Sequence, residues 1–147
     1  MAKWGFWLVV VVAGALGACD HGSVTAPSPS TGYAGEWSGT TSQNQPIAFT
    51  VSADQQVTSL TVGYSFNGCS GTETFSNLSL TIKKLDPPGT PPFNDNPGFG
   101  YAGQTVDGGG TLLLGAFTSN KTSTGQVNFV NFPDCKGSFA TWNATKH

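Results

Sequence analysis

The sequence predicts an all-β protein, and three observations lead to that prediction. Charged residues make up only 10% of the 147 residues, well below the roughly 25% of an average soluble domain. Glycine is frequent, with 20 residues, and 12% of the chain is aromatic. Polar and apolar residues alternate with a period of two in short segments bounded by Gly, Pro, Asn and Ser, which is typical of half-buried strands. We therefore expect one small antiparallel β-barrel or β-sandwich of about seven or eight strands.

The strand pattern recurs along most of the chain. The predicted strands are 35–41, 46–52, 56–66, 73–83, 111–118, 125–132 and 136–144, with an eighth through 99–106. In 73–83, Phe75 is out of phase with the later apolar residues, which predicts a β-bulge near Ser76. Because most connections are short, we expect hairpins in sequence order, as in an up-and-down barrel or a flattened sandwich.

The first residues are typical of an export signal. Lys3 is followed by an uncharged, mostly apolar stretch over 4–18, which is short for a bilayer span and fits the h-region of a signal peptide. The stretch ends in Leu-Gly-Ala before Cys19 and resembles the lipobox of bacterial lipoproteins. That resemblance implies cleavage before Cys19 and lipidation of its side chain and amine. A plain secretory signal and a single-span anchor are the alternatives.

A lipidated Cys19 divides the chain into three parts. Residues 1–18 form the signal peptide, 19–32 a tether rich in Ser, Thr and Pro, and 33–147 the β domain. The mature protein is then exported and lipid-anchored to the bacterial cell membrane or the outer membrane, with its domain facing the periplasm or the exterior. His21 lies in the tether and His147 is the last residue, so we expect no histidine inside the folded body.

The cysteine count agrees with this division. The chain has three cysteines, and if Cys19 carries lipid, Cys69 and Cys135 remain to pair in an oxidising compartment. Such a disulfide closes a loop of about 67 residues and stabilises the fold by roughly 4 kcal/mol in chain-entropy models. Metal ligation by the two thiolates is the alternative, but the chain has no CxxC spacing and no nearby histidine.

Composition argues against several classes of function. Six lysines and no arginine are too few for the basic surface of a nucleic-acid binder. Without a histidine in the body, the base of a Ser–His or Cys–His nucleophile is missing. The only glutamates, Glu36 and Glu73, offer a carboxylate pair for glycoside hydrolysis if they face each other. We expect no enzyme activity, no cofactor and no metal.

The first predicted strand carries Gly35-x-Trp37. This pattern resembles the opening G-x-W of the calycins, the lipocalin and avidin-like barrels, and implies an eight-stranded cup with a ligand mouth. Trp37 is then a candidate ligand contact, together with Tyr64 on the predicted inner wall. The alternatives are that Trp37 plugs an unrelated barrel or forms an exposed platform for a sugar ring.

The stretch 83–110 is the second source of candidate binding residues. It spans 28 residues and holds five prolines together with Phe93, Phe99 and Tyr101. Connections of that length are uncommon in compact domains and are often functional. The three aromatic side chains either contact a ligand or partner, or pack down on the domain.

Together these features predict a lipid-anchored, non-catalytic binding module of the cell envelope. Its ligand is a small apolar molecule, a glycan or an envelope protein. The alternative is an inhibitor or accessory subunit that docks a partner protein through the 83–110 loop, and a third hypothesis is a hydrolase using Glu36 or Glu73. An apolar cavity inside the domain favours a carrier of small molecules, whereas a solid interior favours recognition at the surface.

Overall fold

The structure is a computed structural model that describes residues 32–66, 68–84, 96–105, 108–130 and 138–147. The predicted signal peptide, Cys19 and nearly all of the tether lie outside these residues. So do two residues that the sequence singled out, Phe93 and Cys135. The expectations that fall on them stay predictions.

The described part of the chain contains β-strands and no helix, which confirms the all-β prediction. Eight of its ten strands have six residues or more, and β5 and β6 have two each. The strands are β1 (Gly35–Thr41), β2 (Pro46–Val51), β3 (Gln56–Phe66), β4 (Cys69–Phe75), β5 (Leu80–Thr81), β6 (Lys83–Lys84), β7 (Pro97–Gln104), β8 (Gly110–Phe117), β9 (Thr122–Val130) and β10 (Ser138–Lys146).

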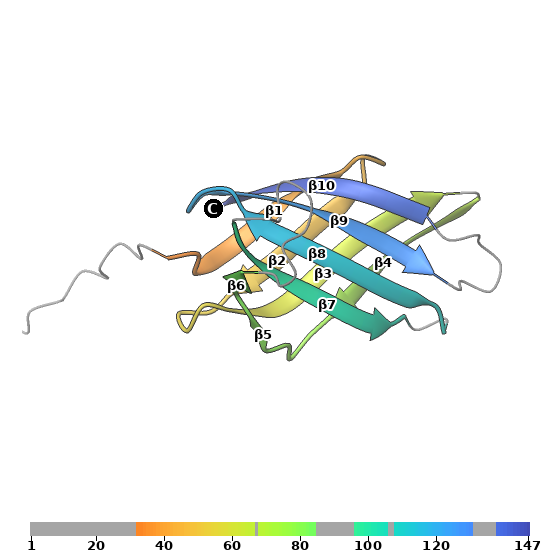
Figure 1. Ribbon diagram of the computed structural model, residues 1–147. Coiled ribbons are helices and arrows are strands. Elements are labelled where there is room, and N and C mark those ends of the chain that lie inside the picture. The colour runs from red at the N-terminus through yellow and green to blue at the C-terminus, as the bar shows by residue number, and fades with distance from the viewer. Residues whose placement is uncertain (1–31, 67, 85–95, 106–107, 131–137) are drawn as a thin grey trace, which may run out of the picture.

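All ten strands belong to one antiparallel sheet (Figure 1). Its order is β4-β3-β2-β1-β10-β9-β8-β7-β6. The chain therefore forms two runs of sequential strands, β1 to β4 and β7 to β10, and β1 pairs with β10 to join them. In that pairing Trp37 lies opposite Lys146 and Thr41 opposite Trp142.

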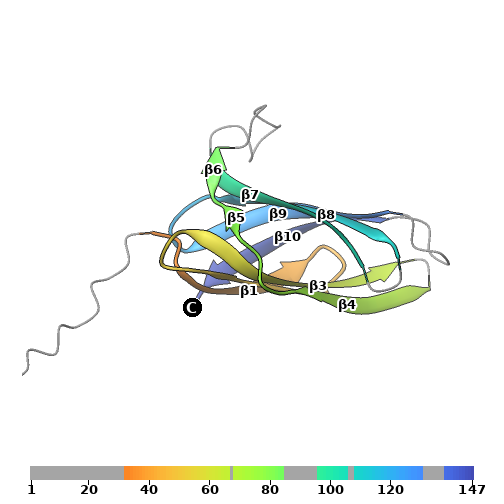
Figure 2. The same ribbon diagram turned by 90° about the horizontal axis from the view of Figure 1, so that it is seen from below.

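The sheet curls until its two runs face each other as two layers (Figure 2). At one end the chain joins them, because β5 pairs with β3 and β6 pairs with β7. Further along, no backbone pairing connects β4 to residues 99–104 of β7 within the described residues. There the rings of Phe75 and Tyr101 meet, with centroids 4.5 Å apart. We call this unpaired line between β4 and residues 99–104 the β4–β7 seam.

Aromatic rings fill the space between the layers. Trp37, Phe49, Phe99, Phe117 and Trp142 are each no more than 2% exposed. Their ring centroids lie 5.0 to 6.4 Å apart in a connected set of contacts, the separations at which offset and edge-on aromatic pairs are stabilising. This part of the interior is packed with side chains, so it offers no room for an apolar ligand.

The alternating pattern explains the long strands. In β2, Ile47, Phe49 and Val51 are buried while Ala48 and Thr50 between them are partly exposed, as the period of two requires. The connection before β2 turns at Asn44, which has a φ of 58° and is one of the few residue types that tolerate this left-handed region. Each layer therefore has one apolar face turned inward and one polar face turned outward.

The prediction of a strand over 73–83 was wrong. β4 ends at Phe75, and the chain leaves it through Asn77, whose φ of 57° is incompatible with a strand. The Leu78 amide then donates to the Thr58 carbonyl at 2.9 Å. The phase change at Phe75 thus marks the end of a strand and not a bulge near Ser76.

The strand predicted through 99–106 is confirmed by β7, which starts two residues earlier and ends at Gln104. The prediction of one long connection over 83–110 was wrong, because β6, β7 and the start of β8 lie within it. Pro97 and Gly98 precede the predicted strand, but both occupy positions where a strand admits them. Pro97 begins the strand, which is a tolerated place for proline. A Cβ at Gly98 would overlap the Gly115 carbonyl oxygen on β8, so this close approach of two strands requires glycine.

Candidate functional site

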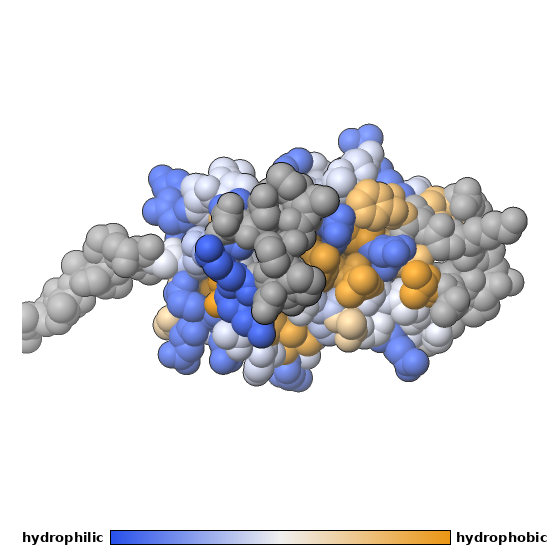
Figure 3. Space-filling model, viewed as in Figure 1, coloured by the Kyte–Doolittle hydropathy of each residue, from blue (hydrophilic) through white to orange (hydrophobic). Residues whose placement is uncertain are grey.

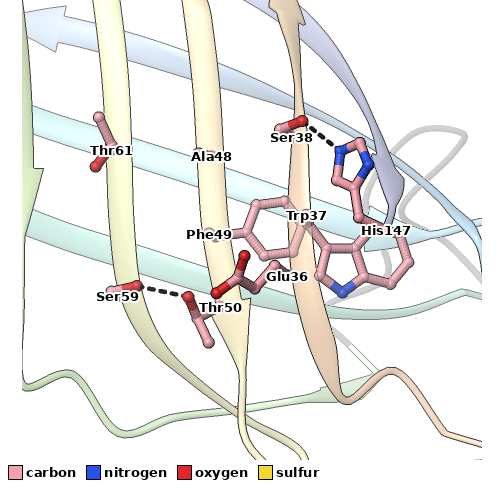
Figure 4. A pocket seen from close by; sticks show the side chains of 9 residues that line it. All are labelled: Glu36, Trp37, Ser38, Ala48, Phe49, Thr50, Ser59, Thr61 and His147. Atoms are coloured by element: carbon pink, nitrogen blue, oxygen red, sulfur yellow. Dashed lines mark hydrogen bonds between the residues drawn. The ribbon is translucent and has the colours of Figure 1, made fainter.

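The outer face of the first three strands carries a hollow of about 320 Å³ that is lined by both polar and apolar groups (Figure 4). We call it the β1–β3 hollow. Its lining residues are Glu36, Trp37, Ser38, Ala48, Phe49, Thr50, Ser59, Thr61 and His147. Carboxylate, hydroxyl and imidazole groups therefore converge on one concavity, which is the kind of surface that fixes a polar ligand by hydrogen bonds.

Strand register builds the hollow in two rows of outward-facing side chains. One row crosses the strands as Glu36, Thr50 and Ser59. The Ser59 hydroxyl donates to Thr50 Oγ1 at 3.0 Å, so these two side chains hold each other in place. Directly opposed residues on neighbouring strands lie about 4.5–5.5 Å apart between Cβ atoms, which brings the three polar groups within reach of one small molecule.

The second row crosses the same strands as Ser38, Ala48 and Thr61. Ala48 lies in the middle of this row and its side chain ends at Cβ, so the surface is hollowed between the longer side chains on either side. Thr61 Oγ1 lies 3.1 Å from Thr74 Oγ1 on β4. A hydroxyl pair therefore continues the polar surface beyond the hollow.

His147 completes the rim next to Ser38, against the expectation that no histidine falls within the folded body. Its amide donates to the Glu36 carbonyl at 3.0 Å. Its Nε2 lies 2.6 Å from Ser38 Oγ. The cause is the pairing of β10 with β1, in which Lys146 lies opposite Trp37, so the next residue of the chain continues alongside β1.

The hollow lies over a rigid aromatic layer. The Trp37 and Phe49 rings stack with centroids 5.5 Å apart and planes 9° apart. The Trp37 indole donates to the Tyr33 carbonyl at 2.9 Å. Because Trp37 is only 1% exposed, its ring fills the core and presents no exposed platform to a sugar.

The other predicted binding residues also lie inward. Phe99 is fully buried and Tyr64 nearly so. Tyr101 is half-buried against Phe75, and burial raises its pKa above the ordinary value of 10.0. Phe93 lies outside the described residues. These aromatic side chains stabilise the fold, and none of those described projects freely into solvent.

The structure separates the two glutamates that a hydrolase would need. Glu36 is exposed on the outer face of β1, in the hollow. Glu73 is 7% exposed and shares the inner face of the sheet with Val62, its partner on β3. The two carboxylates therefore lie on opposite faces and do not form a pair in one cleft.

Cys69 is half-buried and is the first residue of β4. Its predicted disulfide partner, Cys135, lies outside the described residues. The pairing with Cys135 therefore stays a prediction.

A second surface lies on the outer face of β8 to β10. Leu112, Val130 and Phe139 are 46%, 40% and 58% exposed, and register places Leu112 and Phe139 on either side of Asn128. A smaller hollow of about 90 Å³ is lined by Leu112, Leu114, Gln126, Asn128 and Phe139. Figure 3 shows apolar side chains gathered on this side of the molecule.

The described residues contain no cluster of metal-ligating side chains and no helix that could span a membrane. No group of three or more His, Cys, Asp or Glu side chains is arranged there to hold a metal ion. Within the same ranges, no helix has the length and apolar character to cross a bilayer.

No protein-family model, no curated protein and no solved structure matches the chain. The functional assignment therefore depends on the geometry of the site.

Parts of the hollow were visible in the sequence and parts were not. Glu36, Ser38, Thr50 and Thr61 alternate with core residues in predicted strands, so their outward direction follows from the period of two. Their alignment in rows depends on the register, which turn geometry sets. The position of His147 depends on the pairing of the first and last strands, and no local pattern around it signals that pairing.

Proposed function

We propose that the protein is an exported, lipid-anchored binding module of the bacterial envelope that binds a saccharide in the β1–β3 hollow. The observation that carries the proposal is the polar lining of this hollow, with Glu36, Ser38 and His147 at one side and Thr50, Ser59 and Thr61 at the other. Its volume of about 320 Å³ lies at the small end of the roughly 300–1,000 Å³ typical of ligand sites.

The chemistry of the lining favours a glycan over the other predicted ligands. Sugar hydroxyls both donate and accept, and so do serine, threonine and neutral histidine, while the glutamate carboxylate accepts only. A small apolar ligand would cover the Glu36 carboxylate and the remaining hydrogen-bonding capacity of the hydroxyls without satisfying them, which would cost free energy. The aromatic packing between the layers argues against such a ligand in the interior as well.

The proposed role is binding and not catalysis, although Ser38 and His147 lie within hydrogen-bond distance. In a Ser–His–Asp site, a carboxylate orients the second ring nitrogen and backbone amides stabilise the oxyanion. Among the described residues, no carboxylate accepts a hydrogen bond from the other ring nitrogen of His147. The pair instead presents a hydroxyl and an imidazole to a ligand.

Binding to arrayed oligosaccharides tests the proposal. The full chain, purified in detergent, is applied to bacterial polysaccharide fragments and to glucose-, mannose- and N-acetylglucosamine-containing oligosaccharides. We expect binding that Ser38→Ala and His147→Ala each weaken at least tenfold, since each removes a group at the rim. Thr141→Ala on β10, outside the hollow, is the matched control. No binding across the array, or binding that the two variants leave unchanged, would overturn the proposal.

The anchor and the disulfide belong to the same proposal. Two or more acyl chains on Cys19 give stable membrane attachment, and a Cys69–Cys135 bridge would stabilise the exported domain. Metabolic labelling with an alkyne fatty acid should mark the wild type and not Cys19→Ser. Mass spectrometry of a non-reduced digest should yield a peptide joining Cys69 and Cys135. Label on the Cys19→Ser variant, or a different cysteine pair, would contradict these two assignments.

The alternative function, an inhibitor or accessory subunit, has weaker support. This hypothesis predicts docking through the aromatic residues of 83–110. However, Phe99 is buried and Tyr101 lies against Phe75. A protein partner would find its apolar contacts on the outer face of β8 to β10, where Leu112 and Phe139 are exposed. Exposed apolar groups of this kind are common in protein interfaces.

A further inference from the structure

The β4–β7 seam contains a carboxylate without a partner. Glu73 is 7% exposed and lies on the inner face of β4. Among the described residues its carboxylate has neither a hydrogen bond nor an ion pair, and its oxygens keep some contact with solvent, because they are not among the fully buried unpaired atoms. A charge in this position costs free energy unless an opposite charge or hydrogen-bond donors compensate it. The side chain thus has unused capacity to accept hydrogen bonds from a cationic group.

The facing wall of the seam contributes two hydroxyl groups. Thr111 on β8 is 2% exposed, and its Oγ1 is buried without a hydrogen-bond partner. Register places Thr111 opposite Gly103 on β7. The Tyr101 hydroxyl lies over that same glycine, where an added Cβ would overlap it.

Two ring contacts, taken with the strand registers, place Glu73 and these hydroxyls on opposite walls of the same part of the interior. On one side of Glu73, Phe75 meets Tyr101 across the seam. On the other side, the Tyr64 ring lies 5.0 Å from Phe129, which is the partner of Thr111 in the β8–β9 register. Glu73 and Thr111 lie between these two contacts, on opposite walls. A carboxylate and two hydroxyls on a common interior surface form an acceptor set that suits an ammonium or guanidinium group.

The backbone of the seam is also unpaired. β4 pairs with β3 on one side, and in the described part of the chain no strand pairs with its other edge. β7 pairs with β6 only at Gly98 and Pro97, so residues 99–104 have a second unpaired edge. Such edges bind extended peptides by adding a strand, with side-chain pockets selecting every second residue of the peptide.

We infer that the β4–β7 seam is a docking site for an extended peptide segment of a partner protein, carrying a lysine or arginine that points inward beside Glu73. The peptide pairs with the free edge of β4, and its basic side chain meets the acceptor set of Glu73, Thr111 and Tyr101. Charge complementarity decides the choice of partner, because an acidic side chain at that position would meet the Glu73 carboxylate. This site is separate from the β1–β3 hollow and does not depend on glycan binding.

A role in edge protection alone is the competing explanation of Glu73. Inward-pointing charges on edge strands prevent pairing between copies of a protein. In that case Glu73→Gln makes the chain self-associate, and no basic peptide binds to the wild type. The two explanations therefore give different results with the same variants.

The experiment is a selection of random ten-residue peptides, displayed on phage, against the full chain in detergent. We expect the enriched peptides to share a lysine or arginine at one position of an alternating pattern. A synthetic peptide of the enriched sequence should bind Glu73→Gln at least tenfold more weakly than the wild type. Asp54→Asn, which removes an exposed carboxylate in the turn between β2 and β3, should bind it as the wild type does.

Further readouts locate the peptide. Amide hydrogen exchange should slow at alternate residues of β4 when the peptide is bound, and the charge-reversed Glu73→Lys should select acidic residues at the same position. Circular dichroism verifies that each variant is folded. If Glu73→Lys does not fold, the result with Glu73→Gln alone decides the question. The inference is overturned if no peptide is enriched, if the enriched peptide binds Glu73→Gln as tightly as the wild type, or if protection falls outside the seam.

Discussion

The Ser38 hydroxyl and the His147 imidazole lie 2.6 Å apart, although 109 residues separate them along the chain. They meet because β1 and β10, the first and last strands, pair and join the two runs of the sheet. The same pairing brings the His147 amide to the Glu36 carbonyl. One rim of the β1–β3 hollow is therefore built by the contact that connects the two layers.

Filling the hollow should abolish glycan binding without unfolding the protein. Ala48 lies in the middle of a row between Ser38 and Thr61, so Ala48→Leu places a branched side chain where the ligand would bind. We expect at least a tenfold loss of affinity on the oligosaccharide array. The free energy of unfolding should change by no more than about 0.5 kcal/mol, because the site is on the surface.

The matched control is Thr141→Leu, which adds the same side chain to the exposed face of β10. It should leave both binding and stability near the wild-type values. If Ala48→Leu binds as tightly as the wild type while Ser38→Ala does not, the ligand contacts the rim at Ser38 without filling the hollow.

Alanine substitutions at two glycines of the layer formed by β7 to β10 should have opposite effects on stability. A Cβ at Gly125 would overlap the Leu114 carbonyl oxygen and the Trp142 ring, so Gly125→Ala should lower the free energy of unfolding by about 3 kcal/mol. A Cβ at Gly100 meets the end of the flexible Leu114 side chain at 3.1 Å and the Leu113 carbonyl oxygen at an ordinary contact distance of 4.0 Å. Gly100→Ala should therefore raise stability by about 0.5 kcal/mol, since glycine weakens a strand.

Urea unfolding followed by tryptophan fluorescence measures both glycine variants, because Trp142 is in the core. Equal stabilities for Gly125→Ala and the wild type would show that β8, β9 and β10 do not pack as closely as the structure has them.

Two buried hydroxyls should contribute to the free energy of unfolding with opposite signs. Thr111 Oγ1 is buried without a partner, so Thr111→Val keeps the shape, removes an unsatisfied group and should raise stability by about 1 kcal/mol. Ser123 Oγ donates to the Ala116 carbonyl at 2.9 Å in the core, so Ser123→Ala should lower stability by about 1 kcal/mol. Thermal and urea unfolding of the pair measure this, and a loss of stability in Thr111→Val would mean that Oγ1 has a partner in solution.

The sequence predicts the fold class well, because alternation is a local property. The inward set of β2 is visible directly in Ile47, Phe49 and Val51. Prediction from the sequence fails where the neighbouring strand is the reason for a glycine or proline, because that neighbour cannot be identified locally. Gly98 suggests a loop until the Gly115 carbonyl oxygen on β8 is placed against it.

The candidate site was harder to predict than the fold. Trp37 and Phe99 were predicted to be binding residues, but both are buried in the core. A small domain needs large side chains there, so an aromatic residue is not by itself a sign of a binding site. The polar residues of the hollow are ordinary outward positions of strands. What makes them a site is the register of three strands and the end of a fourth, which is not a local property of the chain.

Tyr101 should make stability fall at alkaline pH. Burial raises the pKa of its phenol above the ordinary value of 10.0, so the folded chain holds the proton more tightly than the unfolded chain does. The stabilisation from this difference is fully present below pH 10. It is lost as the pH rises through the raised pKa, because the unfolded state gains stability by ionising first.

Urea unfolding of the wild type and Tyr101→Phe between pH 8 and pH 11.5 provides the test, with tyrosinate absorbance recorded in parallel. We expect the wild type to lose stability more steeply than Tyr101→Phe above pH 10, and the two curves to run parallel below it. The phenylalanine ring keeps the contact with Phe75, which lies 4.5 Å from Tyr101 between centroids, so the slope isolates the hydroxyl. Equal slopes in the alkaline range would mean that the Tyr101 phenol is as solvated in the folded chain as in the unfolded one, and that the β4–β7 seam is open to water there.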